Sequence, residues 1–169
     1  MAVRSASEGI LSDDNKGRRD ELIELLKRAY WMEIETTMSY IANSTNPDGL
    51  RAQEVIESLR TDIQEELGHA QEFAKRIKEL YGVVPGSMDF TPEQTYLQPP
   101  AEQTDIVHVI KGVIEAENGA IDHYNQLIEL TEDIDPVTAD MITAILRDEE
   151  GHRRLFEGFL REFEVAGLA

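Results

Sequence analysis

Apolar residues recur at steps of three and four along four long segments of the chain, which is the spacing of one face of a helix. The segments cover about residues 19 to 44, 50 to 80, 105 to 130 and 136 to 163. No segment shows the strict alternation of apolar and polar residues that is typical of a half-buried strand. The pattern therefore predicts an all-α protein with four helices.

Residues with strong turn or capping preferences mark the ends of these segments. Thr104 is the expected N-cap of the third helix, and Asp135 followed by Pro136 suits the start of the fourth. The second helix is expected to stop near Gly82, because glycine readily adopts the left-handed conformation that ends many helices.

The connections between the segments differ in length, and this difference predicts the topology. The first and last connections are short, so each joins two neighbouring antiparallel helices. The middle connection, residues 81 to 103, holds four prolines and is long enough to run back along helices of about 40 Å. We expect one four-helix bundle, residues 19 to 169, with a long crossover between helices two and three and an N-terminal extension, residues 1 to 18.

Each predicted helix has one glutamate at a position of its apolar face, near the middle of its length. Glu35 and Glu150 fall outside these faces, and Glu115 is the alternative to the better-phased glutamate of the third helix. Asp148 borders the face of the fourth helix and is a candidate to support a ligand. The four inward glutamates are Glu33, Glu66, Glu117 and Glu149.

Four carboxylates in one core need compensation, since an unpaired buried carboxylate costs several kcal/mol. Protonation could neutralise one or two of them but hardly four. Two divalent cations would balance all four charges. The nearest basic residues lie off the apolar faces: Lys75, Arg76, Lys111, Arg147 and Arg153.

Two histidines strengthen the prediction of a metal site. His69 follows Glu66 and His152 follows Glu149 at a spacing of three, which places each pair on one helix face. Each half of the chain thus supplies a helix with one glutamate and then a helix with Glu-x-x-His. This ligand set is known from di-iron and di-manganese carboxylate bundles, and oxygen and nitrogen ligands without sulfur suit iron or manganese.

Composition excludes several other classes of function. The formal net charge of −18 argues against a nucleic-acid partner, because phosphate binding needs a basic surface. The absence of cysteine excludes disulfides, zinc–thiolate sites, iron–sulfur clusters and thiol catalysis. No apolar run has the length of a membrane span, and the N-terminus lacks the apolar core of a signal peptide. We therefore expect no membrane partner and a cytoplasmic location.

The sequence resembles the ferritin-like superfamily, and bacterioferritin in particular, over about residues 19 to 163. The likeness is greatest over "ADMITAILRDEEGH", where bacterioferritins carry a very similar run. A glutamate followed seven residues later by a tyrosine, as in Glu33 and Tyr40, also matches. The resemblance implies a ferritin-like bundle with Tyr40 beside the ligands. It also implies a ferroxidase that oxidises Fe(II) with O₂ or H₂O₂ and stores ferric oxide in a protein shell.

Three features differ from bacterioferritin. Leu67 stands where that family has a haem-binding methionine, so we expect no haem. Only 17 residues follow His152, too few for a fifth helix, which argues against a 24-subunit cage. The N-terminal extension resembles the tails of twelve-subunit Dps-type miniferritins. Dps sites lie between subunits, whereas this site would lie within one, so a Dps-like shell with a bacterioferritin-type centre fits these features.

We therefore expect an iron-storage or iron-detoxifying ferroxidase, with two iron ions per subunit, in a homo-oligomeric shell. Manganese is the alternative metal. A non-storage di-metal peroxidase or manganese catalase would use the same bundle without a shell. A helical interaction module, with its inward acids protonated or paired, would bind no metal.

Overall fold

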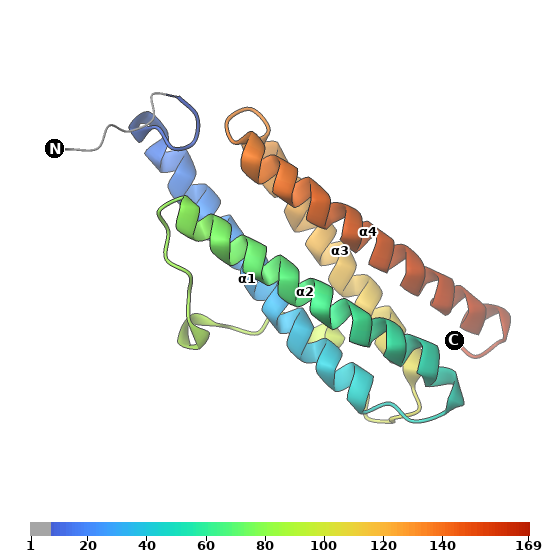
Figure 1. Ribbon diagram of the computed structural model, residues 1–169. Coiled ribbons are helices and arrows are strands. Elements are labelled where there is room, and N and C mark those ends of the chain that lie inside the picture. The colour runs from blue at the N-terminus through green and yellow to red at the C-terminus, as the bar shows by residue number, and fades with distance from the viewer. Residues whose placement is uncertain (1–7) are drawn as a thin grey trace.

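Four long helices make up most of the protein, as the apolar pattern predicted. The computed structural model describes residues 8 to 169, which form no β-strand. The helices α1 (Lys16–Thr45), α2 (Gln53–Glu79), α3 (Ile106–Thr131) and α4 (Pro136–Val165) lie side by side along one axis (Figure 1). The predicted all-α four-helix bundle is therefore confirmed.

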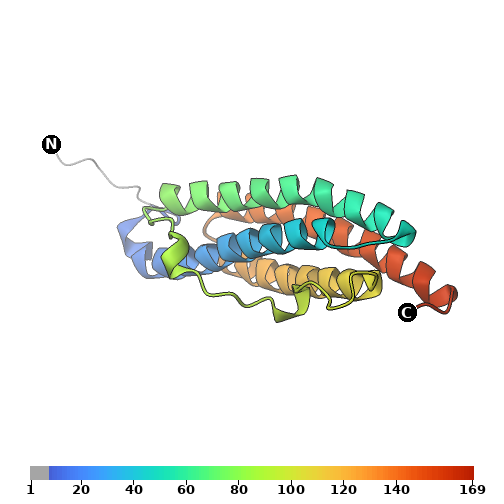
Figure 2. The ribbon, with the colours of Figure 1, turned by 90° about the horizontal axis from the view of Figure 1, so that it is seen from below.

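The long crossover joins α2 to α3 along the outside of the bundle. Figure 2 shows it passing beside α1 and α3, with two short 3-10 turns at Ser87–Asp89 and Thr95–Leu97. The Asn43 side chain of α1 donates a hydrogen bond of 2.8 Å to the Leu97 carbonyl. A side chain at Gly112 of α3 would clash, because its Cβ would lie 2.6 Å from the Tyr96 carbonyl oxygen. The crossover is thus held closely against both helices.

Of the two N-caps predicted for α3 and α4, the structure confirms the one of α4 and contradicts the one of α3. Asp135 caps α4 as predicted, since its side chain accepts a hydrogen bond from the Thr138 amide at 3.1 Å. The N-cap of α3 is Asp105 and not Thr104, because the Asp105 carboxylate accepts from the His108 amide at 3.0 Å. A carboxylate one residue later therefore takes the capping position.

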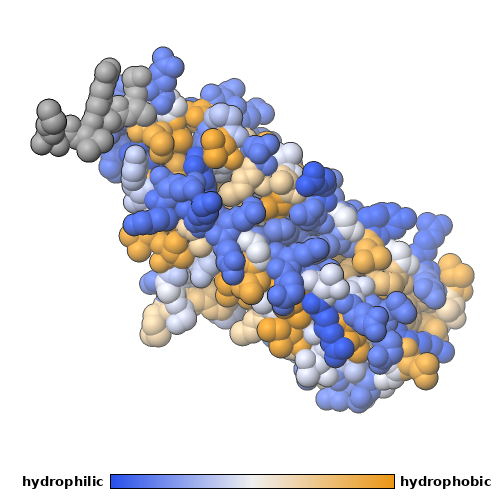
Figure 3. All heavy atoms as spheres, viewed as in Figure 1, coloured by the Kyte–Doolittle hydropathy of each residue, from blue (hydrophilic) through white to orange (hydrophobic). Residues whose placement is uncertain are grey.

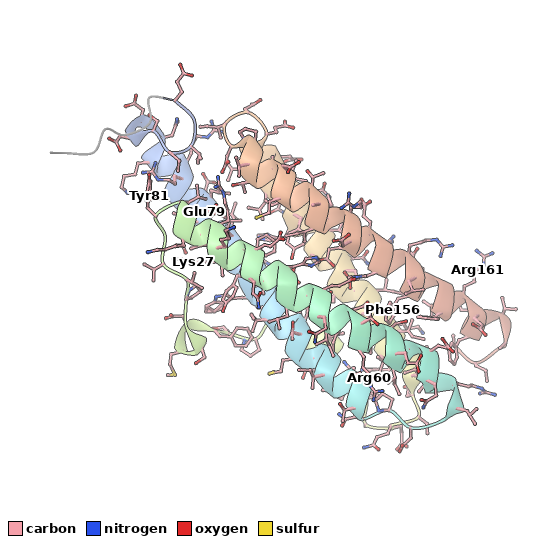
Figure 4. The ribbon with its side chains drawn as sticks, viewed as in Figure 1. Lys27, Arg60, Glu79, Tyr81, Phe156 and Arg161 are labelled. Carbon is pink, nitrogen blue, oxygen red and sulfur yellow. The ribbon has the colours of Figure 1, made fainter. Side chains whose placement is uncertain are left out.

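The end of α2 needs a glycine for a different reason from the one expected. Tyr81, not Gly82, adopts the left-handed conformation, with φ of 70°. The Gly82 amide donates to the Ile77 carbonyl at 2.8 Å, and a Cβ at Gly82 would lie 2.9 Å from a methyl group of Ile23. Tyr81 lies beside the beginning of α1 (Figure 4), where its ring is 5.3 Å from the guanidinium carbon of Arg19. Close packing, more than backbone freedom, requires the glycine.

Residues that precede the predicted start of the first helix pack against the bundle. α1 starts at Lys16, and Ile10 is buried in the apolar core. The Arg19 guanidinium donates to the carbonyl oxygens of Ile10 and Ser12 at 2.9 and 3.1 Å. Part of the predicted extension is therefore fixed to the bundle, while residues 1 to 7 lie outside the described residues.

The apolar core is divided into two clusters, one toward each end of the bundle. On each helix, the predicted inward glutamate lies between the residues given to one cluster and those given to the other. A charged layer thus crosses the middle of the core. The first cluster includes Leu22, Leu26, Phe73, Tyr124 and Ile145, and the second includes Tyr40, Leu59, Ile110, Val113 and Phe156.

The surface is mostly hydrophilic on the side that Figure 3 shows, with apolar residues in small scattered groups. Within residues 8 to 169, no helix has an apolar stretch that could cross a bilayer. Exposed acids such as Glu115 and Glu150 lie on the outside of the bundle, in addition to the buried glutamates at its centre.

Candidate metal centre

All six residues predicted as ligands come together in the charged layer at the middle of the bundle. None of them is more than 8% exposed. Glu117 is buried, whereas its alternative Glu115 is exposed, and Glu150 also faces solvent. The six converging side chains are those of Glu33, Glu66, His69, Glu117, Glu149 and His152.

The six side chains form two overlapping groups. Ligand atoms of Glu33, Glu66, His69 and Glu149 lie within 4.8 Å of one another. The same holds for Glu66 and Glu149 taken together with Glu117 and His152, so the two central glutamates belong to both groups. Two neighbouring positions result, each with one glutamate and one histidine of its own and two shared carboxylates.

Both histidines turn the same ring nitrogen toward the shared carboxylates. His69 Nδ1 lies 3.1 Å from Glu149 Oε1 and 3.7 Å from Glu66 Oε2. His152 Nδ1 lies 3.3 Å from Glu149 Oε2 and 3.5 Å from Glu66 Oε1. The two halves of the site are thus nearly equivalent, as the repeat of Glu-x-x-His in the sequence suggested.

The outer nitrogen of each histidine faces a carboxylate from the opposite helix. His69 Nε2 lies 3.5 Å from Asp148 Oδ2, and His152 Nε2 lies 2.7 Å from Glu65 Oε2. A carboxylate in this position fixes the orientation and tautomer of a metal-binding imidazole. Asp148 was a sequence candidate and Glu65 was missed. Each directly precedes the glutamate of a Glu-x-x-His pair, a repeat that could have revealed Glu65.

Two buried tyrosines hold the glutamates that are not shared. The Tyr40 hydroxyl donates to Glu117 Oε1 at 2.6 Å, and the Tyr124 hydroxyl donates to Glu33 Oε1. Each tyrosine follows the glutamate of its own helix by seven residues but donates to the glutamate of the other helix. Tyr40 was expected beside the site. The sequence did not identify Tyr124 as a partner of the site, although its spacing of seven from Glu117 repeats that of Tyr40 from Glu33.

Burial and mutual repulsion shift the protonation of the site. Burial, followed by repulsion from Glu66 and Glu149, raises the pKa of Glu33 and of Glu117 well above the usual range. Burial opposes the charged form of the histidines, but the neighbouring carboxylates of Glu149 and Glu66 outweigh it. They raise the pKa of His69 to about 10 and that of His152 to about 12. Without cations, the centre therefore reduces its net negative charge by binding protons.

Burial would raise the pKa of Glu66 as well, but the close contacts with Glu33, His152 and His69 outweigh this effect and lower the pKa to about 2. Glu33 therefore binds a proton more readily than Glu66 does. Unequal protonation of neighbouring carboxyls is the expected response of several acids that share one buried space.

The donor atoms fit a pair of divalent cations. Glu66 Oε1, both carboxylate oxygens of Glu149, and Nδ1 of His69 and His152 are buried without a hydrogen-bond partner. Buried polar atoms are normally paired, so atoms left unpaired around one point indicate a missing ligand. Oxygen and imidazole donors in this mixture suit iron or manganese.

Asp62 extends the charged layer beyond the six predicted residues. It is buried beside the site, with Oδ1 3.8 Å from His152 Nε2, and forms a third group with Glu65. Burial raises the pKa of Asp62 to about 6, although the nearby His152 opposes the rise. Asp62 lies on α2 one turn before Glu66, outside the predicted apolar face, so periodicity gave no signal for it.

A four-helix bundle with a buried set of four glutamates and two histidines defines the class of carboxylate-bridged metal proteins. The Ferritin family model, described as a ferritin-like domain, matches residues 23 to 166. The chain therefore belongs to the ferritin-like family. This confirms the resemblance found in the sequence.

Relatives within the family carry the names of both Dps-type proteins and bacterioferritins. The DNA protection during starvation protein of Pyrococcus furiosus is 31% identical over 146 residues, which cover 83% of this chain and 77% of that protein. The dodecameric thioferritin of Bacteroides fragilis, a bacterioferritin-related protein, has a TM-score of 0.78 at 26% identity, covering 88% of this chain and 89% of that one.

A third comparison supports the fold. The bacterioferritin of Desulfovibrio desulfuricans, whose structures describe its di-iron site in different catalytic states, has a TM-score of 0.76 at 23% identity. The match covers 90% of this chain and 85% of that chain. The bundle and its connectivity are therefore those of ferritin-like proteins.

The outer carboxylates lead to a testable prediction about affinity. Removing a carboxylate that orients a ligating histidine weakens metal binding by about 10–100-fold. We expect Glu65→Ala to have the larger effect, because its oxygen is 2.7 Å from His152, and Asp148→Ala the smaller, at 3.5 Å from His69. Isothermal titration with Mn(II) measures both, with Glu150→Ala as the exposed control. An unchanged affinity in Glu65→Ala would contradict the orienting role.

Proposed function

We propose that the protein is an iron-storage or iron-detoxifying ferroxidase with a di-iron centre inside each subunit. The observation that carries the proposal is the pair of overlapping donor groups, in which one oxygen of Glu66, both oxygens of Glu149 and Nδ1 of the two histidines have no hydrogen-bond partner among the described residues. Fe(II) is the substrate, and O₂ or H₂O₂ accepts its electrons. With H₂O₂, two Fe(II) ions give one electron each, and two protons complete the formation of two waters.

Some of the six side chains would contact both ions, and the others would contact one ion each. Glu66 and Glu149 would be the ligands shared by the two ions, because both belong to both donor groups. Glu33 with His69, and Glu117 with His152, serve as the separate ligands of the two positions. Iron bound there supplies the one-electron redox chemistry that none of these side chains has. Manganese fits the same donors and stays an alternative metal.

The hydrogen-bond partners of the ligands hold them in position before a metal ion binds. Tyr40 and Tyr124 hold the carboxylates of Glu117 and Glu33 in place from opposite helices. Such pre-positioned donors lower the reorganisation needed when a charged ligand is bound. Because the tyrosines carry protons that they donate to carboxylates, they also favour the ionised form that a cation requires.

Assembly into a homo-oligomeric shell belongs to the same proposal. The related thioferritin of Bacteroides fragilis is dodecameric, and a shell would give oxidised iron a closed space. We propose no haem, because Leu67 occupies the position of the methionine ligand and has no haem-binding side chain. We propose no nucleic-acid partner, because the net charge is −18.

Light scattering after gel filtration, combined with metal analysis, tests shell and site together. We expect a particle of many subunits, about two iron ions per subunit at the centres, and oxidation of added Fe(II) in air. A monomer or dimer that still oxidises Fe(II) would exclude iron storage and would indicate a non-storage di-metal enzyme. A protein that binds neither iron nor manganese would leave only a helical interaction module.

Metal binding should stabilise the protein more strongly as the pH rises. Without metal, the raised pKa values of Glu33, Glu117, His69 and His152 stabilise the fold at low pH. For the histidines, this contribution is lost as the pH rises through about 10 and 12. Divalent cations must displace these protons, so their binding releases protons and strengthens with pH.

Thermal unfolding with and without Mn(II) between about pH 5.5 and 8 measures this effect. At a concentration of about 100 times the Kd, Mn(II) adds about 2.7 kcal/mol of stability, or about 5–10 °C in Tm. The increment should shrink steadily toward the acid end. An increment that is equal at all pH values would show that the cation binds elsewhere.

A further inference from the structure

A groove and a small cavity lie on opposite sides of one wall of side chains under the crossover. The groove, of about 640 Å³, runs between α1 and the crossover and includes Lys27, Trp31 and Asp89 in its lining. The cavity lies deeper and is bordered by all four glutamates of the metal centre. On the crossover face, open space therefore lies close to the site.

The wall between groove and cavity is one residue thick. Met32 of α1 lines both spaces. Glu35 and Glu93 line the groove, while the residues that follow them in the chain, Thr36 and Gln94, line the cavity. A rearrangement of very few side chains would connect solvent in the groove with the metal centre.

Gln94, which lines the cavity, has an unused side-chain oxygen atom. Its side chain is buried, with 3% exposure. The amide nitrogen donates to the Thr36 hydroxyl at 2.7 Å and to the Met32 carbonyl at 3.4 Å, whereas Oε1 has no hydrogen-bond partner. A buried carbonyl oxygen without a donor is unfavourable unless a ligand uses it. The carbonyl oxygen of an amide is a ligand type that suits hard divalent cations.

Glu35 fixes Gln94 in this position. The Glu35 carboxylate is buried and accepts hydrogen bonds from the Gln94 amide at 2.9 Å and from the Glu93 amide at 2.9 and 3.0 Å. The sequence placed Glu35 outside the apolar face of α1, but its carboxylate is buried against the crossover. Its role is to tie the crossover to α1, so that the Gln94 side chain stays on the wall of the cavity.

The size of the cavity determines what can pass. Its volume is about 10 Å³, which is close to the space that one water molecule needs. A divalent cation that keeps a full octahedral shell of water is much larger than this. It must therefore lose water at the wall, and protein oxygens must replace that water if the step is to be fast.

The groove itself favours cations. Four acidic side chains and two basic ones line it, which gives a net charge of −2. Clefts with a negative lining raise the local concentration of cations and speed their arrival. The acidic members are Glu24, Glu35, Asp89 and Glu93, and the basic members are Lys27 and Arg28.

We propose that Fe(II) reaches the di-metal centre from the crossover face, across the wall at Met32, with the Gln94 side-chain oxygen as a transit ligand that replaces lost water. This inference rests on the proposed function, because it concerns the path of the same substrate to the same site. A transit ligand lowers the barrier for arrival and departure alike. It therefore changes rates and leaves the equilibrium affinity of the centre unchanged.

Stopped-flow binding of Co(II) to the purified, assembled protein tests the path without oxidation of the metal. We expect Gln94→Leu, which removes the oxygen but keeps much of the volume, to slow Co(II) binding about tenfold or more. The Kd from equilibrium titration should stay within about twofold of the wild-type value. Gln94→Glu keeps a ligand oxygen at the same place and should bind Co(II) at least as fast as the wild type.

Gln103→Leu is the matched control, because it makes the same change at an exposed position of the same crossover. It should bind Co(II) at the wild-type rate, and thermal unfolding of all variants confirms that they are folded. Wild-type rates in Gln94→Leu would overturn the path. So would a loss of affinity in proportion to the rate, because Gln94 would then belong to the site itself. A wild-type protein that binds no Co(II) at the centre would instead overturn the proposed function.

Discussion

Replacing Glu149 with glutamine should reduce Fe(II) oxidation to the rate in buffer without protein. The Glu149 carboxylate lies 3.1 Å from Nδ1 of His69 and 3.3 Å from Nδ1 of His152, so it is central to both donor groups. Glutamine keeps the shape but loses the charge and one of the two ligand oxygens that a bridge needs. Since removal of even an outer carboxylate costs about 10–100-fold in affinity, loss of a bridging ligand should cost more than about 100-fold.

The control for this variant is the adjacent Glu150→Gln, which makes the same change on the solvent side of α4. It should oxidise Fe(II) at the wild-type rate. Stopped-flow absorbance of the ferric product gives both rates. Residual activity of Glu149→Gln within about threefold of the wild type would exclude Glu149 as a bridging ligand.

Loss of folding would not account for the expected result. Without metal, Glu149 is one of four carboxyl groups that share a buried space, and removal of a buried charge lowers the cost of desolvation. Glutamine also removes the acid partner of His69 and His152, and these two effects oppose each other. The metal-free variant should therefore still unfold in one cooperative transition, which thermal unfolding measures. Mn(II) should stabilise the wild type and not the variant, which separates the loss of the site from any loss of the fold.

The arrangement of the six site residues follows from the sequence because it depends on helical periodicity alone. A glutamate at a core position of a helix must point inward wherever that helix packs, so Glu33 and Glu117 could be distinguished from Glu35 and Glu115. The histidines are placed by the same rule, since a spacing of three keeps them beside Glu66 and Glu149. Their role as metal ligands stays a prediction until metal binding is measured.

Contacts between helices could not be derived in this way. Tyr40 donates to Glu117 and Glu65 contacts His152, and each contact depends on how far one helix is shifted along another. Periodicity fixes the face of a helix but not this shift. The repeats of Tyr after Glu and of an acid before Glu-x-x-His were visible, but they did not show which partner each residue would find.

The crossover produced the other differences from expectation. Glu35 lies off the face that packs in the bundle, yet it is buried, because the crossover covers that part of α1 and directs two backbone amides at its carboxylate. A sequence pattern that assumes one buried face per helix cannot predict that a loop will bury a second face. The residues that separate the groove from the metal centre, such as Gln94, were missed for this reason.

Replacing Asp135 with alanine should cause the largest loss of stability outside the metal centre. The Arg76 guanidinium donates to Asp135 at 2.8 and 2.9 Å and to the Thr138 hydroxyl at 2.7 Å, and Asp135 also caps α4. Arg76 was predicted off the apolar face, but both it and Asp135 are buried. Removing one partner of a buried ion pair costs about 3–5 kcal/mol, or about 6–20 °C in Tm.

Differential scanning calorimetry measures this loss, and Lys75→Ala serves as the control. Lys75 is adjacent to Arg76, but its ion pair with Glu79 spans 4.0 Å at an exposed position. The control should therefore change the free energy of unfolding by less than about 0.5 kcal/mol. A loss below about 1 kcal/mol in Asp135→Ala would show that solvent already screens the Arg76–Asp135 pair.

A double-mutant cycle separates the ion pair from the helix cap. Arg76→Met leaves the Asp135 carboxylate capping α4 but without its cation, and Asp135→Asn keeps a capping side chain but leaves the Arg76 guanidinium without its buried acid. The double variant Arg76→Met/Asp135→Asn leaves no buried charge unpaired. If the unpaired charge is the main cost, the double variant should be more stable than the sum of the single effects predicts. Below its Tm it should still bind Mn(II) at the centre, because neither residue is among those that form the donor groups. Stability at this end of the bundle and chemistry at its middle would then be separable properties of the same helices.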